Sequence, residues 1–96
     1  MPSRPPGAKP AEITTRAADQ LGGALARFRA LSHLSQAQVA ASAGLRQATV
    51  SKAEQGIPTT QLETIYALCA ALALELVVRP REGGRAPARL EDFIPQ

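Results

Sequence analysis

The sequence has no tryptophan, one tyrosine, two phenylalanines and a single cysteine among its 96 residues. One cysteine excludes an internal disulfide and a cysteine-based metal cluster. Because aromatic side chains are so few, the core has to be built from leucine, valine and alanine. A chain of this length with 45% hydrophobic residues is predicted to fold as one small domain.

Long apolar runs are also lacking. No stretch approaches the roughly 20 apolar residues that span a membrane, and Met1–Pro10 lacks the apolar centre of a secretory signal. We therefore expect a cytoplasmic protein that makes no membrane contact. The formal net charge of +3 is mildly basic, which permits nucleic-acid binding without demonstrating it.

Proline and glycine mark the two ends of the chain. Residues 1–12 contain four prolines and no apolar period, and residues 81–96 contain a glycine pair and two prolines. Both are predicted to be flexible tails around a domain at 13–80. Phe93 and Ile94 are candidates for a short docking segment in the second tail, and a plain disordered end is the equal alternative.

The most informative stretch is residues 34–56, LSQAQVAASAGLRQATVSKAEQG. Ser35 is predicted to cap a short helix that Gly44 ends, because glycine tolerates the left-handed conformation. A second helix is predicted from Arg46 or Gln47 to Gln55, with Gly56 as its stop. Two short helices joined by a glycine turn indicate a helix-turn-helix.

The outer face of the second helix is polar and uncharged to basic. Its members are Arg46, Gln47, Ala48, Ser51, Lys52 and Gln55. Amide and basic side chains suit base edges and phosphates, whereas a merely solvated face is more often rich in Glu and Lys. A plain helical hairpin, which is the alternative, does not account for this face.

This stretch resembles the phage-repressor family (Cro/cI-like, XRE). The residues that carry the resemblance are Gln36, Ala40, Gly44, Gln47, Thr49-Val50-Ser51, Glu54 and Gly56. The second helix of that family enters the major groove. Base contacts are then predicted for Arg46, Gln47, Ala48 and Ser51, and phosphate contacts for Gln36, Thr49, Lys52 and Arg29. The resemblance also implies that Arg29 pairs with Glu54; two independent surface charges are the alternative.

A first helix is predicted within residues 11–31, starting near Thr15 or Asp19, with Leu21, Leu25 and Phe28 on one face. Gly22 and Gly23 weaken its interior, and one of them is expected to permit close helix packing. His33 follows in a link where a residue that tolerates positive φ is needed, so we expect a turn role and no catalysis.

Residues 59–72 are predicted to form another helix, with Thr60 and Glu63 at capping-box spacing. Its apolar stripe is Leu62, Ile65, Leu68, Cys69 and Leu72. Cys69 is therefore interpreted as a small core residue rather than a reactive thiol.

Residues 74–79, LELVVR, alternate in the manner of a strand that Pro80 ends. Because no second strand is visible, the same strand of a second subunit is the expected partner. Leu74, Leu76, Val77 and Val78 are the predicted dimerisation residues. The alternative is a fifth helix, which other phage-type repressors have.

A helical repressor core followed by one strand resembles the HipB-type antitoxins. The resemblance implies an all-α domain of four to five helices, a C-terminal strand that pairs in a homodimer, and a palindromic double-stranded DNA operator. It also implies repression of the protein's own operon, neutralisation of a HipA-like kinase toxin, and no enzyme activity, cofactor or metal. A free-standing repressor and an interaction module that no longer binds DNA are the competing hypotheses.

Overall fold

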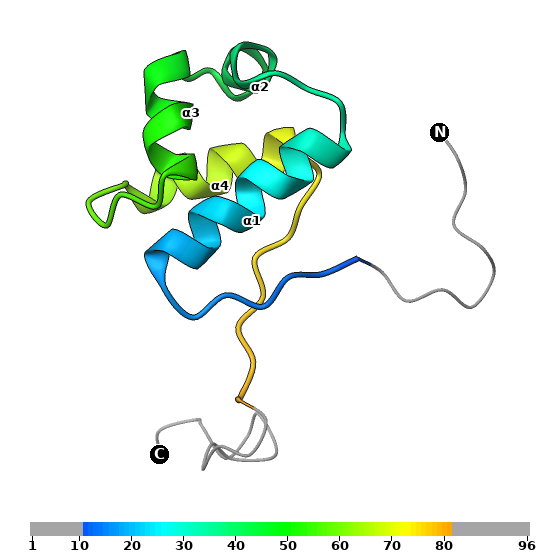
Figure 1. Ribbon diagram of the computed structural model, residues 1–96, viewed down its shortest axis with the longest axis vertical. Coiled ribbons are helices and arrows are strands. Elements are labelled where there is room, and N and C mark those ends of the chain that lie inside the picture. The colour runs from blue at the N-terminus through cyan, green and yellow to red at the C-terminus, as the bar shows by residue number, and fades with distance from the viewer. Residues whose placement is uncertain (1–10, 82–96) are drawn as a thin grey trace, which may run out of the picture.

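The structure is a computed structural model, and it describes residues 11–81. Its four helices are α1 at Ala18–Leu31, α2 at Gln36–Ala43, α3 at Gln47–Glu54 and α4 at Leu62–Ala71 (Figure 1). The predicted all-α class is confirmed for this part of the chain. Nearly all of both predicted tails, with Phe93 and Ile94, lies outside the described residues.

All four helices contribute to one aliphatic core. Its buried members are Leu25, Val39, Ala40, Val50, Ala53, Ile65, Leu68 and Cys69. Burial of each larger aliphatic side chain stabilises the fold by roughly 1.5–3 kcal/mol. Cys69 belongs to this core as predicted, and its burial raises the pKa of the thiol.

Helix α1 begins at Ala18, so residues 11–17 precede the helix rather than forming part of it. Gly22 is the glycine that permits close packing. A Cβ atom placed there would lie 2.6 Å from the carbonyl oxygen of Ala53 and 2.6 Å from the backbone nitrogen of Gly56. Gly23 faces open space, since a Cβ atom at that position would meet no heavy atom within 4 Å.

The turns around α2 and α3 follow the local signals of the sequence. Ser35 Oγ accepts a hydrogen bond from Gln38 N at 3.0 Å, and Ser35 N donates to Gln38 Oε1 at 2.8 Å, which completes a capping box. Gly44 at φ 69° and Gly56 at φ 74° end α2 and α3 in the left-handed region. His33 at φ 58° has the predicted turn conformation.

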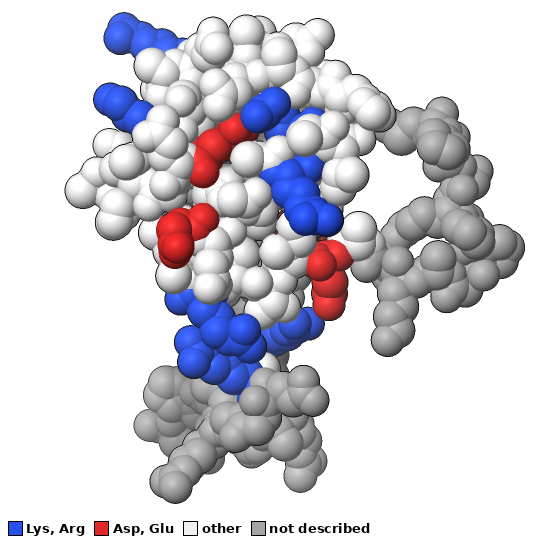
Figure 2. Space-filling model, viewed as in Figure 1, with Lys and Arg blue, Asp and Glu red and all other residues white. Residues whose placement is uncertain are grey.

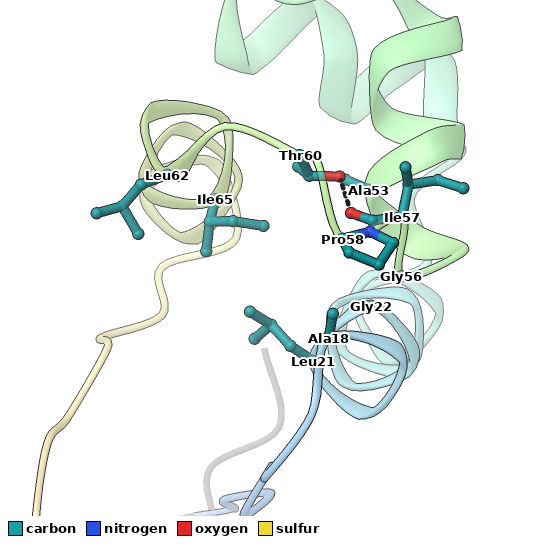
Figure 3. A pocket seen from close by; sticks show the side chains of 10 residues that line it. All are labelled: Ala18, Leu21, Gly22, Ala53, Gly56, Ile57, Pro58, Thr60, Leu62 and Ile65. Carbon is teal, nitrogen blue, oxygen red and sulfur yellow. Dashed lines mark hydrogen bonds between the residues drawn. The ribbon is translucent and has the colours of Figure 1, made fainter.

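The capping box predicted at Thr60 and Glu63 is wrong. Helix α4 is capped at Gln61 without a side-chain hydrogen bond. The hydroxyl of Thr60 instead donates to the carbonyl oxygen of Ile57 at 2.7 Å (Figure 3). Thr60 therefore belongs to the α3–α4 loop, where its side chain closes a turn. Because the hydroxyl group is used in this turn, it does not cap α4.

Residues 74–81 form neither a strand nor a fifth helix in the described part of the chain. Leu74 N donates to Cys69 O at 2.7 Å, and no backbone hydrogen bond follows between residues 75 and 81. A strand needs a neighbour, and residues 11–81 supply none for this segment. Arg79 contacts Thr14 and Glu12 where the N-terminal segment crosses it (Figure 1). Strand pairing stays a prediction.

Candidate nucleic-acid interface

Helices α2 and α3 form a two-helix unit whose turn packs against the hydrophobic core. Leu45, at the corner, packs against the core. Val50 is fully buried and Ala53 is 2% exposed, so these two residues fix the inner side of α3. Helix α3 lies along one edge of the molecule, and α2 lies beside its upper end (Figure 1). The opposite side of α3 therefore faces solvent.

The predicted base-contacting residues come together at the start of α3. Arg46 is its N-cap residue, and Arg46, Gln47 and Ala48 are exposed. Ser51 is half-buried one turn later and accepts a hydrogen bond from Gln55 Nε2 at 3.1 Å. Basic side chains project from this end of the molecule (Figure 2). The face offers an amide, a guanidinium and short side chains to a ligand.

An ion pair connects α1 to the end of α3, as the resemblance implied. Arg29 Nε lies 2.6 Å from Glu54 Oε2, and Arg29 Nη2 lies 2.9 Å from Glu54 Oε1. Arg29 Nη1 also donates to the carbonyl oxygen of Leu34 at 2.9 Å. The two side chains are only 19% and 8% exposed. This bidentate geometry connects α3 firmly to α1.

The Glu54 carboxylate stays ionised in spite of its burial. Burial by itself would raise the pKa of Glu54, but hydrogen bonds from Arg29 and Gln36 and the charge of Arg29 lower it below the usual value. The hydrogen bond to Glu54 is also the main reason that the pKa of Arg29 is raised. Each partner therefore favours the charged form of the other.

The four predicted phosphate-contacting residues fall into two groups. Lys52 is exposed and Thr49 half-buried on α3. Gln36 and Arg29 already form hydrogen bonds within the protein. Gln36 Nε2 donates to Glu54 Oε1 at 3.0 Å, and Arg29 donates to Glu54 and to the carbonyl oxygen of Leu34. Arg29 uses three of the five N–H groups of a guanidinium in these contacts, which leaves two for a phosphate.

Two structural roles were missed by the sequence analysis. The hydrogen bond from Gln36 to Glu54 links the start of α2 to the end of α3, and no spacing rule predicts a contact between residues 18 apart. The role of Gln38 in the capping box could have been found, because Ser35-x-x-Gln38 has the required spacing.

The predicted dimerisation residues become more exposed along the segment. Leu74 is half-buried against the core, whereas Leu76 is 41%, Val77 71% and Val78 96% exposed.

No group of three or more His, Cys, Asp or Glu side chains in residues 11–81 is arranged to hold a metal ion. None of the four described helices has the length and apolar character needed to cross a membrane.

A small aliphatic core that presents two short helices, the second with an exposed polar face, defines a helix-turn-helix DNA-binding domain. The helix-turn-helix family model matches residues 25–78, which is more than half of the sequence. The chain therefore belongs to the helix-turn-helix family, and the predicted Cro/cI-like (XRE) type is confirmed.

Solved structures of HipB share the fold. A HipB variant in complex with an O2 20mer is 26% identical to this chain, with a TM-score of 0.70 over 75% of this chain and 100% of that chain. HipB with an O4 20mer has 24% identity and a TM-score of 0.70. The HipA-HipB-O2-O3 complex has 24% identity and a TM-score of 0.69, over 74% of this chain. No curated protein matches the sequence.

Proposed function

We propose that this chain is a dimeric, sequence-specific DNA-binding antitoxin that represses its own operon and neutralises a HipA-like kinase. The observation that carries the proposal is the exposed polar face of α3, held rigidly by the pair of Arg29 and Glu54. Similar HipB chains have been solved with 20mers and with HipA, which supports both parts of the proposal.

Side-chain chemistry assigns the base contacts. The Gln47 amide can form two hydrogen bonds with adenine, and the Arg46 guanidinium can form two with guanine. Ala48 and Ser51 are short enough for the bases to approach α3 closely. Gln47 is exposed and has no hydrogen bond to another described side chain, so its amide is available for DNA.

Phosphate contacts position α3 in the groove without reading the sequence. Lys52 and Thr49 lie on α3 beside the proposed base-reading residues. Gln36 begins α2, and the backbone N–H groups of a helix N-terminus bind phosphate. The two remaining N–H groups of Arg29 would complete this set.

A palindromic operator requires two copies. We assign the dimer contact to Leu74, Leu76, Val77 and Val78, of which the last three are among the exposed large apolar residues. The centres of the two operator half-sites would then lie about 10 base pairs apart, so that the two copies of α3 enter successive major grooves.

The kinase has to bind away from the α3 face, because DNA occupies that face. Phe93 and Ile94 are large apolar residues near the end of the sequence, and the acidic Glu91 and Asp92 precede them. An acidic and apolar peptide of this kind suits a basic nucleotide-binding cleft. These residues lie outside the described part of the chain.

The deciding experiment is a gel shift with DNA from upstream of the protein's own gene and with random DNA of equal length. We expect selective retardation that weakens steeply as salt is raised. If neither DNA is retarded, the chain is an interaction module. A kinase reading frame beside the gene, and co-purification of its product, would distinguish an antitoxin from a free-standing repressor.

A further inference from the structure

The hydroxyl group of Ser51 is used differently from those of Ser32 and Thr60. Ser32 Oγ and Thr60 Oγ1 each donate to a backbone carbonyl oxygen earlier in the chain, at 2.9 Å and 2.7 Å, so their protons are used inside the protein. Ser51 Oγ instead accepts a hydrogen bond from Gln55 Nε2 at 3.1 Å, and it donates to no group within residues 11–81. The hydroxyl proton of Ser51 is therefore available to a ligand.

Gln55 is held in place beside this hydroxyl group. It is the C-cap residue of α3, and its backbone N–H group donates to Ser51 O at 3.1 Å. The next residue, Gly56, packs against the backbone of Ala18 and Asp19. These contacts fix the end of α3 from which the Gln55 amide reaches Ser51.

The electrostatics of the helix end favour one orientation of the amide. The carbonyl oxygens of the last turn give the C-terminus of a helix a partial negative charge. An amide placed there favours its NH2 group toward the helix and its oxygen away from it, which is the orientation of Gln55. The reverse orientation would bring Oε1 toward these carbonyl oxygens and would make Ser51 the donor.

Ser51 lies between a proposed base-reading residue and the amide that holds it. Gln47, Ser51 and Gln55 follow one another at intervals of four, so they form a row along the outer side of α3 (Figure 1). A hydroxyl group has one proton and two lone pairs, and Gln55 already binds one of the lone pairs. To accept a second hydrogen bond from a base, the hydroxyl would have to turn its proton away from that base. Position 51 therefore presents a hydrogen-bond donor.

We propose that Gln55 is a positioning residue for base recognition, which holds the Ser51 hydroxyl as a donor so that position 51 selects a base with an acceptor on its major-groove edge. Guanine N7 and O6, adenine N7 and thymine O4 meet this requirement, whereas cytosine presents only its N4 amino group. This inference rests on the proposed function, because it specifies how the proposed base contact of Ser51 discriminates. Cytosine should be disfavoured at the contacted base.

Paired pyrimidines test the polarity of Ser51. Uracil carries an acceptor oxygen where cytosine carries a donor amino group, and it lacks the methyl group of thymine. Each position of the operator half-site is substituted with either base, paired with its complement, and affinities are measured by fluorescence anisotropy at one salt concentration. At one position the unaltered chain should prefer uracil about 5- to 10-fold, and Ser51→Ala should bring that ratio to about one.

Two variants at position 55 test the role of the amide. Gln55→Met keeps the length of the side chain without its hydrogen bond, so the hydroxyl can turn and the preference for uracil should fall to about 2-fold or less. Gln55→Glu can only accept, so the hydroxyl should donate to the carboxylate and the preference should reverse toward cytosine. Each ratio is taken within one variant, so a general loss of affinity from the added negative charge cancels.

Gln61→Met is the matched control for the loss of an amide. Gln61 is exposed and caps α4 without a side-chain hydrogen bond, so this variant should leave every base ratio unchanged. A preference of the unaltered chain for cytosine at the position that depends on Ser51 would overturn the donor role. A Gln55→Met variant with the ratio of the unaltered chain would overturn the positioning role.

The two proposals fail in different ways. If the unaltered chain binds its operator more tightly than random DNA but Ser51→Ala changes no base ratio, the inference is wrong and the proposed DNA binding stands. If the unaltered chain retards neither DNA, the proposed function is wrong and this inference falls with it.

Discussion

At the scale of single residues, Glu54 accepts hydrogen bonds from Arg29 and Gln36 and so connects α1, α2 and α3. Removal of one charge from such a partly buried pair leaves the other desolvated without compensation. Helix α3 is therefore positioned by charge as well as by the aliphatic contacts of Val50. Residues outside this network, such as Gln47 and Lys52, remain available for DNA.

Glu54→Gln should reveal the contribution of the ionised carboxylate through its pH dependence. Because the folded state lowers the pKa of Glu54, this group stabilises the fold above its unfolded pKa of about 4.3, and the effect is lost as pH falls through the lower folded value. The variant should lose about 2 kcal/mol of unfolding free energy at neutral pH. Its difference from the unaltered chain should shrink below about pH 4.

Urea unfolding of the two proteins at neutral and acid pH measures this difference. Glu63→Gln is the matched control, because Glu63 is exposed and should change the unfolding free energy by less than about 0.5 kcal/mol. A difference that stays constant down to about pH 3 would contradict an ionised Glu54 as the source of the stability.

Gln47→Ala should separate base reading from general affinity. Loss of two hydrogen bonds to one base should cost about 1–3 kcal/mol on the operator and little on random DNA. Fluorescence anisotropy with both DNAs at one salt concentration measures the two effects. Equal losses on both would show that Gln47 does not read bases.

Lys52→Ala should have the opposite signature. A phosphate contact carries no sequence information, so operator and random DNA should be weakened alike. The slope of log affinity against log salt should fall in magnitude by about one unit, because one counterion fewer is released. An unchanged slope would remove Lys52 from the phosphate-binding set.

At the scale of elements, α1 and the end of α3 cross at small residues. Gly22 lies against the carbonyl oxygens of Ala53 and Glu54 and the nitrogen of Gly56. Gly56 itself lies against the backbone of Ala18 and Asp19. These backbone contacts, together with the small side chain of Ala53, bring the helices close enough for Arg29 to reach Glu54. An apolar pocket of about 220 Å³ opens beside this crossing, between Leu21, Ile57 and Leu62 (Figure 3).

Gly22→Ala and Gly23→Ala should have opposite effects on stability. A Cβ at position 22 has to displace backbone atoms that lie 2.6 Å away, so we expect a loss of about 1–3 kcal/mol. A Cβ at position 23 meets no atom within 4 Å, so the better helix propensity of alanine should add about 0.5–1 kcal/mol. Thermal unfolding of the two variants in parallel measures both. If Gly22→Ala is also stabilised, the close crossing is not a constraint.

At the scale of the whole molecule, residues 74–81 run from beside α1 away from the α2–α3 end (Figure 1). Contact between two copies through residues 75–79 would therefore leave the α3 face exposed. The chain also extends beyond the part that HipB structures match, since they cover about three quarters of it.

Deletion of residues 89–96 should leave operator binding unchanged and weaken binding to the co-purified kinase. Burial of Phe93 in a pocket would contribute roughly 1.5–3 kcal/mol, which corresponds to a 10- to 150-fold loss of affinity in calorimetry. Phe93→Ala with Ile94→Ala in the full chain should reproduce most of that loss. Equal affinity of the truncated and full chains would move the kinase contact to the folded body.

Local signals in the sequence determined the helix-turn-helix. Ser35, Gly44 and Gly56 each satisfy a requirement of neighbouring backbone groups, namely a free N–H group at a helix start or a left-handed φ at a helix end. Such requirements are met within a few residues, so spacing alone predicts them. The pair of Arg29 and Glu54 was predicted because the motif resembles a known family, and the structure confirms it.

Tertiary structure decided what depends on contacts between distant segments. Gly22 rather than Gly23 is needed at the helix crossing, and Thr60 is used in a loop, because of the backbone atoms that lie near them. Gln36 binds Glu54 because the fold brings their side chains together. No period or composition encodes those distances. The strand predicted at 74–79 stays a prediction, because the hydrogen-bonding partner proposed for it belongs to a second molecule.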